Sequence, residues 1–255
     1  MISLKSPREI KLMREAGRVV AEVLAALSEK TKPGITTEEL DAIAEETILR
    51  NNAIPAFKGY GGGRGRPAFP ASICASVNDE VVHGVPGRRI LKEGDILSID
   101  VGVVKDGYVG DAAKTLPVGR ISPEAARLIK ICREALDRGI QAVRPGGKLS
   151  DVSRAIQQHA EANGCSVVRK LVGHGIGTEM HEAPQIPNYV AAEFPVVTLK
   201  PGMTLAIEPM INQGTHRVKT ESNGWTVVTE DGKLSAHFEH TVAVTREGAE
   251  VLTLP

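Results

Sequence analysis

Apolar residues recur at helical spacing near the start of the chain. Met13, Val20 and Leu27 fall on one face of a 3.6-residue repeat, and Pro7 suits the first turn of a helix. This pattern predicts an amphipathic helix from about Pro7 to Lys30.

The hydrophobic pattern continues into further helices and strands. Thr36 is a typical N-cap residue, and Glu39 three residues later completes a capping box. Helices are predicted at 36–52, from Ser122-Pro123 to Arg144-Pro145-Gly146, and at 149–163. Apolar runs predict strands near Ala71–Ser76, Asp95–Val104, Tyr108–Thr115, Val167–Leu171, Met203–Ile211, Trp225–Thr229 and His237–Val244.

Two stretches, LKEGDILSID (91–100) and LKPGMTLAIE (199–208), read as copies of one another. Each ends in a carboxylate at the close of an apolar run. An Asp-Gly turn and then another acid, Asp111 or Glu239, follow each copy. The helix pairs also recur about 110 residues apart, which indicates one ancestral unit used twice. We therefore expect two α/β halves that face each other across a pseudo-two-fold axis.

Composition narrows the class of protein. Lys plus Arg and Asp plus Glu both number 31, so no net charge attracts nucleic acid or an anionic membrane. The three cysteines lack a C-x-x-C spacing, which argues against a disulfide framework or a thiolate zinc site. Charged residues interrupt the N-terminus, and no window approaches 18 apolar residues. With no linker composition to divide 1–255, we expect one cytoplasmic domain without a membrane anchor.

The acids of the first half are predicted to share a hairpin. If its turn lies at Lys105-Asp106, Asp100 faces Asp111 directly; if the turn is Asp106-Gly107, Asp111 lies diagonal to Asp100 on the same face. Two carboxylates this close on a part-buried face need a shared proton or a bridging cation. A solvated Asp111 beside a separately paired Asp100 is the plainer alternative for this hairpin alone, but the second copy favours the cation.

Histidine supplies a nitrogen donor for such a cation. His174 lies between glycines in GHGIG, where small neighbours let the ring approach a crowded site. The run lacks the features of a phosphate loop or a dinucleotide site, so nucleotide binding is not predicted. His83 and His181 are further candidates, although each alone is typical of a core or loop histidine. The poorer candidates are His159, His216, His237 and His240.

Four carboxylates and one imidazole suit Mn²⁺, Fe²⁺, Co²⁺ or Zn²⁺, and carboxylates can bridge two such ions. Paired ions acidify a shared water and polarise a carbonyl group under attack. The sequence thus indicates a hydrolase acting on peptide bonds.

The motifs SIDVG, GDAAKT, GHGIG, IEPM and FEHT, in this order, resemble those of the methionine aminopeptidases, specifically the shorter type I form. The resemblance spans essentially the whole chain. It implies the pita-bread fold, an α/β (α+β) fold with two halves around a central antiparallel sheet. It also implies removal of the N-terminal methionine from nascent polypeptides when the next residue is small, through a water or hydroxide that bridges the metals. The implied enzyme is a cytoplasmic monomer that acts near the ribosome.

The resemblance also implies roles for individual residues. The ligands of two divalent ions would be Asp100, Asp111, His174, Glu208 and Glu239, with Asp111 and Glu239 bridging. Glu208 matches the general base, and His83 and His181 match the two histidines that contact the substrate. The methionine pocket would be formed by Phe69, Cys74, Met180 and Trp225. Ser98, Val101 and Ser235 match a site for a monovalent cation, although a plain core role fits them as well.

Two features depart from the family pattern. Met180 stands where an aromatic residue is common, and a Gly/Arg-rich loop precedes Phe69. The short spacing from His181 to Glu208 leaves no room for the type II insertion, and the first helix starts so early that no N-terminal extension is expected. Prolidases and aminopeptidase P share the ligands but carry a separate N-terminal domain. Relatives that serve as nucleic-acid or histone-binding modules have lost the ligands.

Overall fold

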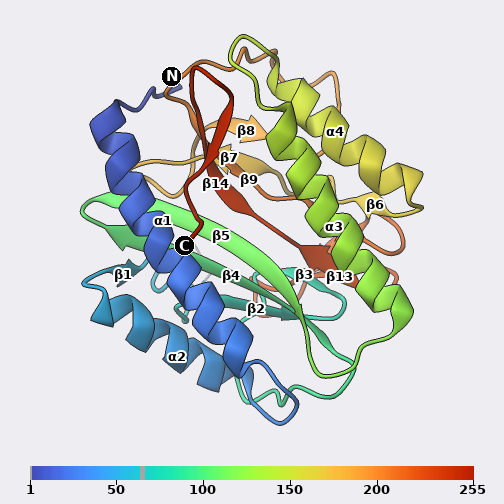
Figure 1. Ribbon diagram of the computed structural model, residues 1–255. Coiled ribbons are helices and arrows are strands. Elements are labelled where there is room, and N and C mark those ends of the chain that lie inside the picture. Colours follow the sequence, from blue (N-terminus) through green and yellow to red (C-terminus); the bar gives the residue numbers. More distant parts are fainter. Residues whose placement is uncertain (1, 64–66) are drawn as a thin grey trace.

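The computed structural model describes residues 2–63 and 67–255, and helices and antiparallel strands alternate along it (Figure 1). The helices are α1 (Pro7–Lys30), α2 (Thr37–Arg50), α3 (Pro123–Ala142) and α4 (Leu149–Ala162). The strands are β1 (Ile54–Pro55), β2 (Cys74–Val77), β3 (Glu80–Val82), β4 (Ile96–Lys105), β5 (Tyr108–Pro117), β6 (Ser166–Val167), β7 (Gly173–Gly175), β8 (Glu182–Ile186), β9 (Thr204–Ile207), β10 (Met210–Asn212), β11 (Val218–Thr220), β12 (Val227–Thr229), β13 (Ser235–His237), β14 (His240–Val244) and β15 (Ala249–Val251). The predicted mixed α/β class is confirmed.

Capping side chains set the helix starts. Ser6 and Glu9 form a capping box at α1, with Pro7 in the first turn. The predicted box of Thr36 and Glu39 is present at α2, where the Thr36 hydroxyl accepts from the Glu39 backbone N–H at 3.2 Å. Such caps satisfy backbone donors that the first turn leaves unpaired. The predicted helix starts are confirmed, while α2, α3 and α4 end one or two residues earlier than predicted.

In the first half, α1 and α2 pack on a sheet of order β1-β4-β2, with β5 paired to β4. Leu97, Ile99 and Val101 of β4 form a buried core with Val20 and Leu27 of α1. Alternate residues of a strand face opposite sides of the sheet. Asp100 therefore lies on the face of β4 opposite the one that packs against the helices. Figure 1 shows α1 crossing over β5, against which it packs.

The β4–β5 hairpin decides between the two predicted registers. Lys105 pairs with Tyr108, so Asp106-Gly107 forms the turn, and both residues have positive φ. Gly102 pairs with Asp111, whereas Asp100 pairs with Ala113. Asp111 therefore lies diagonal to Asp100, as the Asp-Gly turn predicts, and direct pairing is wrong.

In the second half, α3 and α4 pack together and α3 lies against β10 and β13. The larger sheet has the order β15-β14-β9-β7-β8. Two segments were predicted as continuous strands, and this was wrong. Segment 203–211 is broken at Glu208-Pro209, and segment 237–244 is broken at Phe238-Glu239. His240 pairs with Ile207 and His237 pairs with Met210, so one register continues across both breaks. Both breaks thus place an acid where the ladder is interrupted.

Other strands also differ from expectation. The predicted strand 167–171 is only two residues long, and His174 itself lies on a strand, β7. Strand β2 starts three residues later than predicted. The short strands β1, β3, β8, β11 and β15 were not predicted, because they form through pairing with distant segments rather than through local periodicity.

The two halves meet along β5. The Glu239 N–H donates to the Ala113 carbonyl at 2.9 Å, and the Thr241 hydroxyl donates to the Asp111 carbonyl at 2.8 Å. These bonds bring acids from both halves to one junction. Within the described residues, no helix is long and apolar enough to cross a membrane.

Candidate metal centre and its pocket

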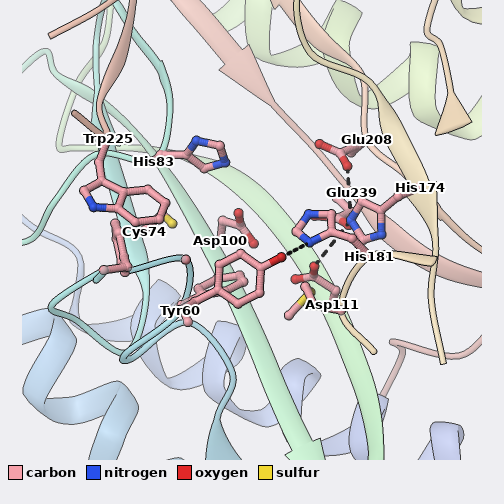
Figure 2. A pocket seen from close by; sticks show the side chains of 14 residues that line it. Tyr60, Cys74, His83, Asp100, Asp111, His174, His181, Glu208, Trp225 and Glu239 are labelled. Carbon is pink, nitrogen blue, oxygen red and sulfur yellow. Dashed lines mark hydrogen bonds and ion pairs between the residues drawn. The ribbon is translucent and has the colours of Figure 1, made fainter. Parts of the chain in front are cut away.

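A cavity of about 260 Å³ opens at the junction of the two halves (Figure 2). Every residue that the sequence suggested as a divalent-metal ligand, catalytic group or part of the methionine pocket lines it. These residues are Phe69, Cys74, His83, Asp100, Asp111, His174, Met180, His181, Glu208, Trp225 and Glu239. The structure thus brings together groups that lie up to 170 residues apart in the chain. Their individual roles remain predictions.

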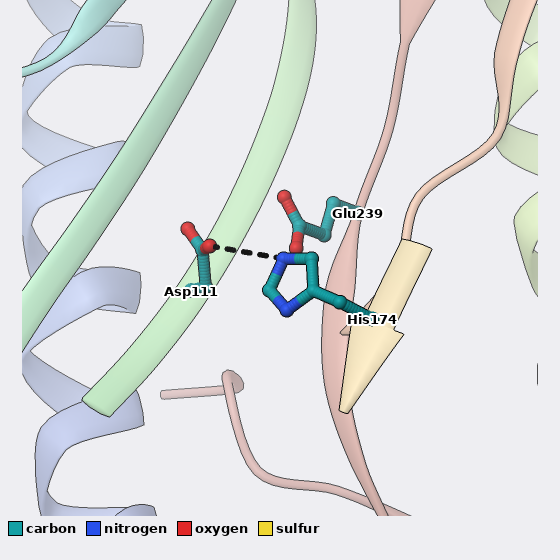
Figure 3. Close-up of side chains that lie close together, drawn as sticks. All are labelled: Asp111, His174 and Glu239. Atoms are coloured by element: carbon teal, nitrogen blue, oxygen red, sulfur yellow. Dashed lines mark ion pairs between the residues drawn. The ribbon is translucent and has the colours of Figure 1, made fainter. Parts of the chain in front are cut away.

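Five of these side chains form a compact acidic cluster. Asp100 and Asp111 come from β4 and β5, His174 from β7, and Glu208 and Glu239 from the two strand breaks. The ligand atoms of Asp111, His174 and Glu239 all lie within 4.8 Å of one another (Figure 3). Nε2 of His174 is 4.0 Å from Oδ2 of Asp111 and 3.5 Å from Oε1 of Glu208.

The backbone fixes the tautomer of His174. Its Nδ1 lies 2.9 Å from the Gly175 carbonyl oxygen, which can only accept a hydrogen bond. Nδ1 therefore carries the proton, and the lone pair of Nε2 faces the acids. Burial lowers the pKa of His174 to about 4, with the nearby His181 as a second cause, so the ring is a neutral donor at pH 7. Gly173 makes this approach feasible, because a Cβ there would lie 2.4 Å from the Ala206 carbonyl oxygen.

The acids are unfavourably placed without a cation. Burial raises the pKa of Asp100 to about 7 and raises the pKa values of Asp111, Glu208 and Glu239 well above the usual range, with neighbouring carboxylates adding to the effect at these three. Oδ1 of Asp100, Oδ1 of Asp111 and Oε1 of Glu239 are buried and have no hydrogen-bond partner among the described residues. Buried anions and orphaned acceptors are stabilised by a bound cation. This donor set therefore fits divalent metal binding.

The two substrate-histidine candidates lie on either side of the cluster. The His181 ring is 4.3 Å from that of His174, and its Nδ1 lies 2.6 Å from the Tyr60 hydroxyl oxygen. Figure 2 shows this contact between the two side chains. His83 has a positive φ of 58° and lies edge-on to Trp225, with ring centroids 6.4 Å apart.

Apolar and soft side chains form the rest of the cavity. Phe69, Cys74 and Trp225 belong to one buried cluster, and the Phe69 and Trp225 rings meet edge to face at 5.1 Å. Cys74 pairs with Asp100 across β2 and β4, so the thiol lies beside the acids. Burial, followed by the charges of Asp100 and Asp111, raises the pKa of Cys74 well above its usual value. The thiol is therefore a neutral pocket group.

The candidate site for a monovalent cation stays a prediction. The Ser98 hydroxyl is 2.8 Å from that of Thr115, and the Ser235 hydroxyl donates to Asn212 Oδ1 at 2.8 Å. These contacts also suit the plain core role considered for Ser98, Val101 and Ser235. Residues 64–66 of the Gly/Arg-rich loop lie outside the described part of the chain.

Sequence reasoning missed three residues near this site. Phe57 and Tyr60 line the cavity from an irregular segment that carries no periodic signal. Nε2 of His237 lies 3.8 Å from Oε2 of Glu208, although the sequence ranked His237 among the poorer candidates. Burial lowers the pKa of His237 to about 3. The signal that could have found it is its position two residues before an acid of the cluster.

Comparison with known proteins decides the family. The model of metallopeptidase family M24 matches residues 11–246. The chain belongs to metallopeptidase family M24. This M24 chain is 53% identical to methionine aminopeptidase 1 of Bacillus subtilis over 253 residues, covering 99% of each chain. It is 52% identical to the methionine aminopeptidase of Clostridium acetobutylicum, covering 100% of this chain and 99% of the other.

A solved structure gives the same assignment. The crystal structure of methionine aminopeptidase from Thermotoga maritima superposes with a TM-score of 0.95, at 45% identity, and each chain is covered completely. The M24 chain therefore has the pita-bread fold that the resemblance implied. The type I affinity is also confirmed, since relatives of this length match from end to end.

Proposed function

We propose that the protein is a metal-dependent aminopeptidase that removes N-terminal methionine when the second residue is small. The observation that carries the proposal is the cluster of four carboxylates and one imidazole, all buried except the half-buried Glu208, which opens directly into an apolar pocket. Membership of a metallopeptidase family supports the chemistry. Relatives that are more than 50% identical bear the name methionine aminopeptidase, which supports the substrate.

Asp100, Asp111, His174, Glu208 and Glu239 would hold two divalent ions chosen from Mn²⁺, Fe²⁺, Co²⁺ and Zn²⁺. The orphaned oxygens of the cluster and the neutral Nε2 of His174 support this ligand set. When bound, such ions lower the pKa of a water and polarise the carbonyl group under attack. Asp111 and Glu239 would be shared by the two ions, and their ligand atoms and that of His174 lie within 4.8 Å of one another.

The chain's own residues would handle the proton and the substrate. Glu208 would accept the proton of the attacking water and pass it to the departing amine. If the Tyr60 hydroxyl donates to Nδ1 of His181, Nε2 keeps a proton that can stabilise the developing oxyanion. His83 would contact the substrate from the side of Trp225.

The apolar end of the cavity would receive the methionine side chain. Phe69 and Trp225 form two walls at nearly right angles, and Cys74 and Met180 contribute sulfur. Soft, adaptable groups of this kind suit a thioether. A Cβ at Gly102 would lie 2.7 Å from the end of Met180 and from the Phe57 ring, so glycine leaves room for both groups in the pocket.

The natural substrates would be nascent polypeptides, which places the reaction in the cytoplasm near the ribosome. We propose that the enzyme acts there as a monomer, because all groups assigned to the site come from one chain. Neither nucleic acid nor membrane is required by this activity.

Release of free amino acid from synthetic peptides tests the proposal. Metal-free protein reloaded with Mn²⁺ or Co²⁺ should release methionine from Met-Ala-Ser, release far less from Met-Leu-Ser, and leave Ala-Pro uncleaved. Protein kept in chelator serves as the control. Cleavage of Ala-Pro in preference to Met-Ala-Ser would assign a prolidase-type activity instead, and no cleavage of any peptide at full metal occupancy would favour a binding role.

A further inference from the structure

His237 lies next to Glu208, and none of the roles proposed above involves it. Its side chain is 2% exposed, and its Nε2 has no hydrogen-bond partner among the described residues. Oε2 of Glu208 is 3.8 Å from this nitrogen. A buried polar nitrogen is rarely left unpaired, so this carboxylate is its natural partner after a small adjustment.

The backbone holds the His237 ring in this place. Its N–H donates to the Thr115 hydroxyl at 2.9 Å, and that hydroxyl donates to its carbonyl at 2.8 Å. His237 also pairs with Met210, two residues beyond Glu208, in the β10–β13 ladder. The ring lies on β13 and the acid lies two residues before β10, the strand paired with it, so the fold fixes their separation.

The two oxygens of Glu208 face different histidines. Oε1 lies 3.5 Å from Nε2 of His174 on the side of the acidic cluster, whereas Oε2 faces His237. A hydrogen bond at Oε2 would hold the carboxylate plane and leave Oε1 directed at the cluster. Groups that bond to a metal ligand from behind in this way commonly strengthen metal binding.

We propose that His237 is a positioning residue for Glu208: its Nε2–H donates to Oε2 and keeps Oε1 directed toward the metals and the attacking water. The proposal rests on the function proposed above. It requires the tautomer of His237 that carries its proton on Nε2, because only that form can donate to the carboxylate.

Two variants separate hydrogen bonding from filling of space. His237→Gln keeps an N–H donor of similar reach, whereas His237→Leu fills the space without a donor. Calorimetric titration of the metal-free proteins with Mn²⁺ should show affinity weakened roughly 10- to 100-fold in the leucine variant and by no more than about threefold in the glutamine variant. For Met-Ala-Ser, kcat should fall more than KM rises in the leucine variant.

His240→Leu is the matched control, because His240 is half-buried and adjacent to Glu239 but bonds to Thr253 at 2.8 Å, away from the cavity. It should lower the melting temperature and leave Mn²⁺ affinity unchanged. Circular dichroism of all metal-free variants shows whether they are folded. If the leucine variant does not fold, the glutamine variant and the wild-type tautomer carry the test.

The tautomer is read by nitrogen-15 NMR of the histidine rings in wild-type protein loaded with Zn²⁺. Protonated Nε2 at His237 supports the proposal; protonated Nδ1 with a bare Nε2 overturns it, as does wild-type Mn²⁺ affinity in a folded leucine variant. If no peptide is cleaved but the leucine variant still weakens Mn²⁺ binding, the proposed aminopeptidase activity fails and the role of His237 stands.

Discussion

Replacing Asp100 with asparagine should stabilise the metal-free protein and weaken the metal-loaded one. Asp100 is buried on β4, and its Oδ1 has no hydrogen-bond partner in the described part of the chain. Asparagine has nearly the same shape but no charge. In metal-free protein it removes the cost of burying an anion, whereas with metal present it removes a ligand.

The size of the first effect follows from the pKa of Asp100, which burial raises from 3.8 to about 7. A raised folded-state pKa means that the folded state holds its proton longer than the unfolded chain, so stability falls as pH rises from about 4 to about 7. Three pKa units correspond to roughly 4 kcal/mol at most, and we expect about 2 to 4 kcal/mol at pH 8. For a chain of this length that raises the melting temperature by roughly 5 to 15 °C.

Thermal unfolding followed by circular dichroism measures this prediction. Wild type and Asp100→Asn are compared in chelator at pH 4 and pH 8, with Asp137→Asn, an exposed change on α3, as the control. The stabilisation should be present at pH 8, small at pH 4, and absent in the control. Excess Mn²⁺ should raise the melting temperature of wild type more than that of Asp100→Asn. A metal-free Asp100→Asn protein that melts below wild type at pH 8 would refute the electrostatic reasoning.

Three further predictions address the same site. Glu239→Ala should abolish methionine release and lower metal content while circular dichroism shows a retained fold; two bound metals with near-normal turnover would contradict the ligand assignment. Cys74→Ser should raise KM for Met-Ala peptides roughly 5- to 30-fold with a smaller change in kcat, because a buried hydroxyl replaces a soft thiol at a cost of about 1 to 2 kcal/mol. If the serine variant loses metal instead, Cys74 does not line the methionine pocket. Activity should fall at acid pH because protons compete with metal for the carboxylates, whose pKa values burial raises, so excess metal should shift the acid limb to lower pH; an acid limb that does not respond to metal would indicate another cause.

Local chemistry made the helices and the first hairpin predictable. A helical pattern with Ser6 or Thr36 as its cap fixes where a helix begins, and Asp106-Gly107 specifies a turn that sets the register of Asp111. The duplication made the second pair of acids predictable. Each of these signals lies within a few residues of the feature that it predicts.

Contacts between distant segments were not predictable. At the break at Glu239, the backbone bonds to β5 where β5 meets β13 and β14, a contact that periodicity cannot detect. Tyr60 lies in an irregular segment and meets His181 only in the folded chain. The sequence ranked His237 and His240 together among the poorer candidates, yet in the fold one ring lies near Glu208 and the other bonds to Thr253.

Anomalous diffraction from crystals soaked in Mn²⁺ is the most direct test of the proposed metal centre. The account predicts two peaks about 3.5 to 4 Å apart within the cavity. The residues around them should be Asp100, Asp111, His174, Glu208 and Glu239. A cavity without anomalous signal, or ions held by other residues, would contradict it.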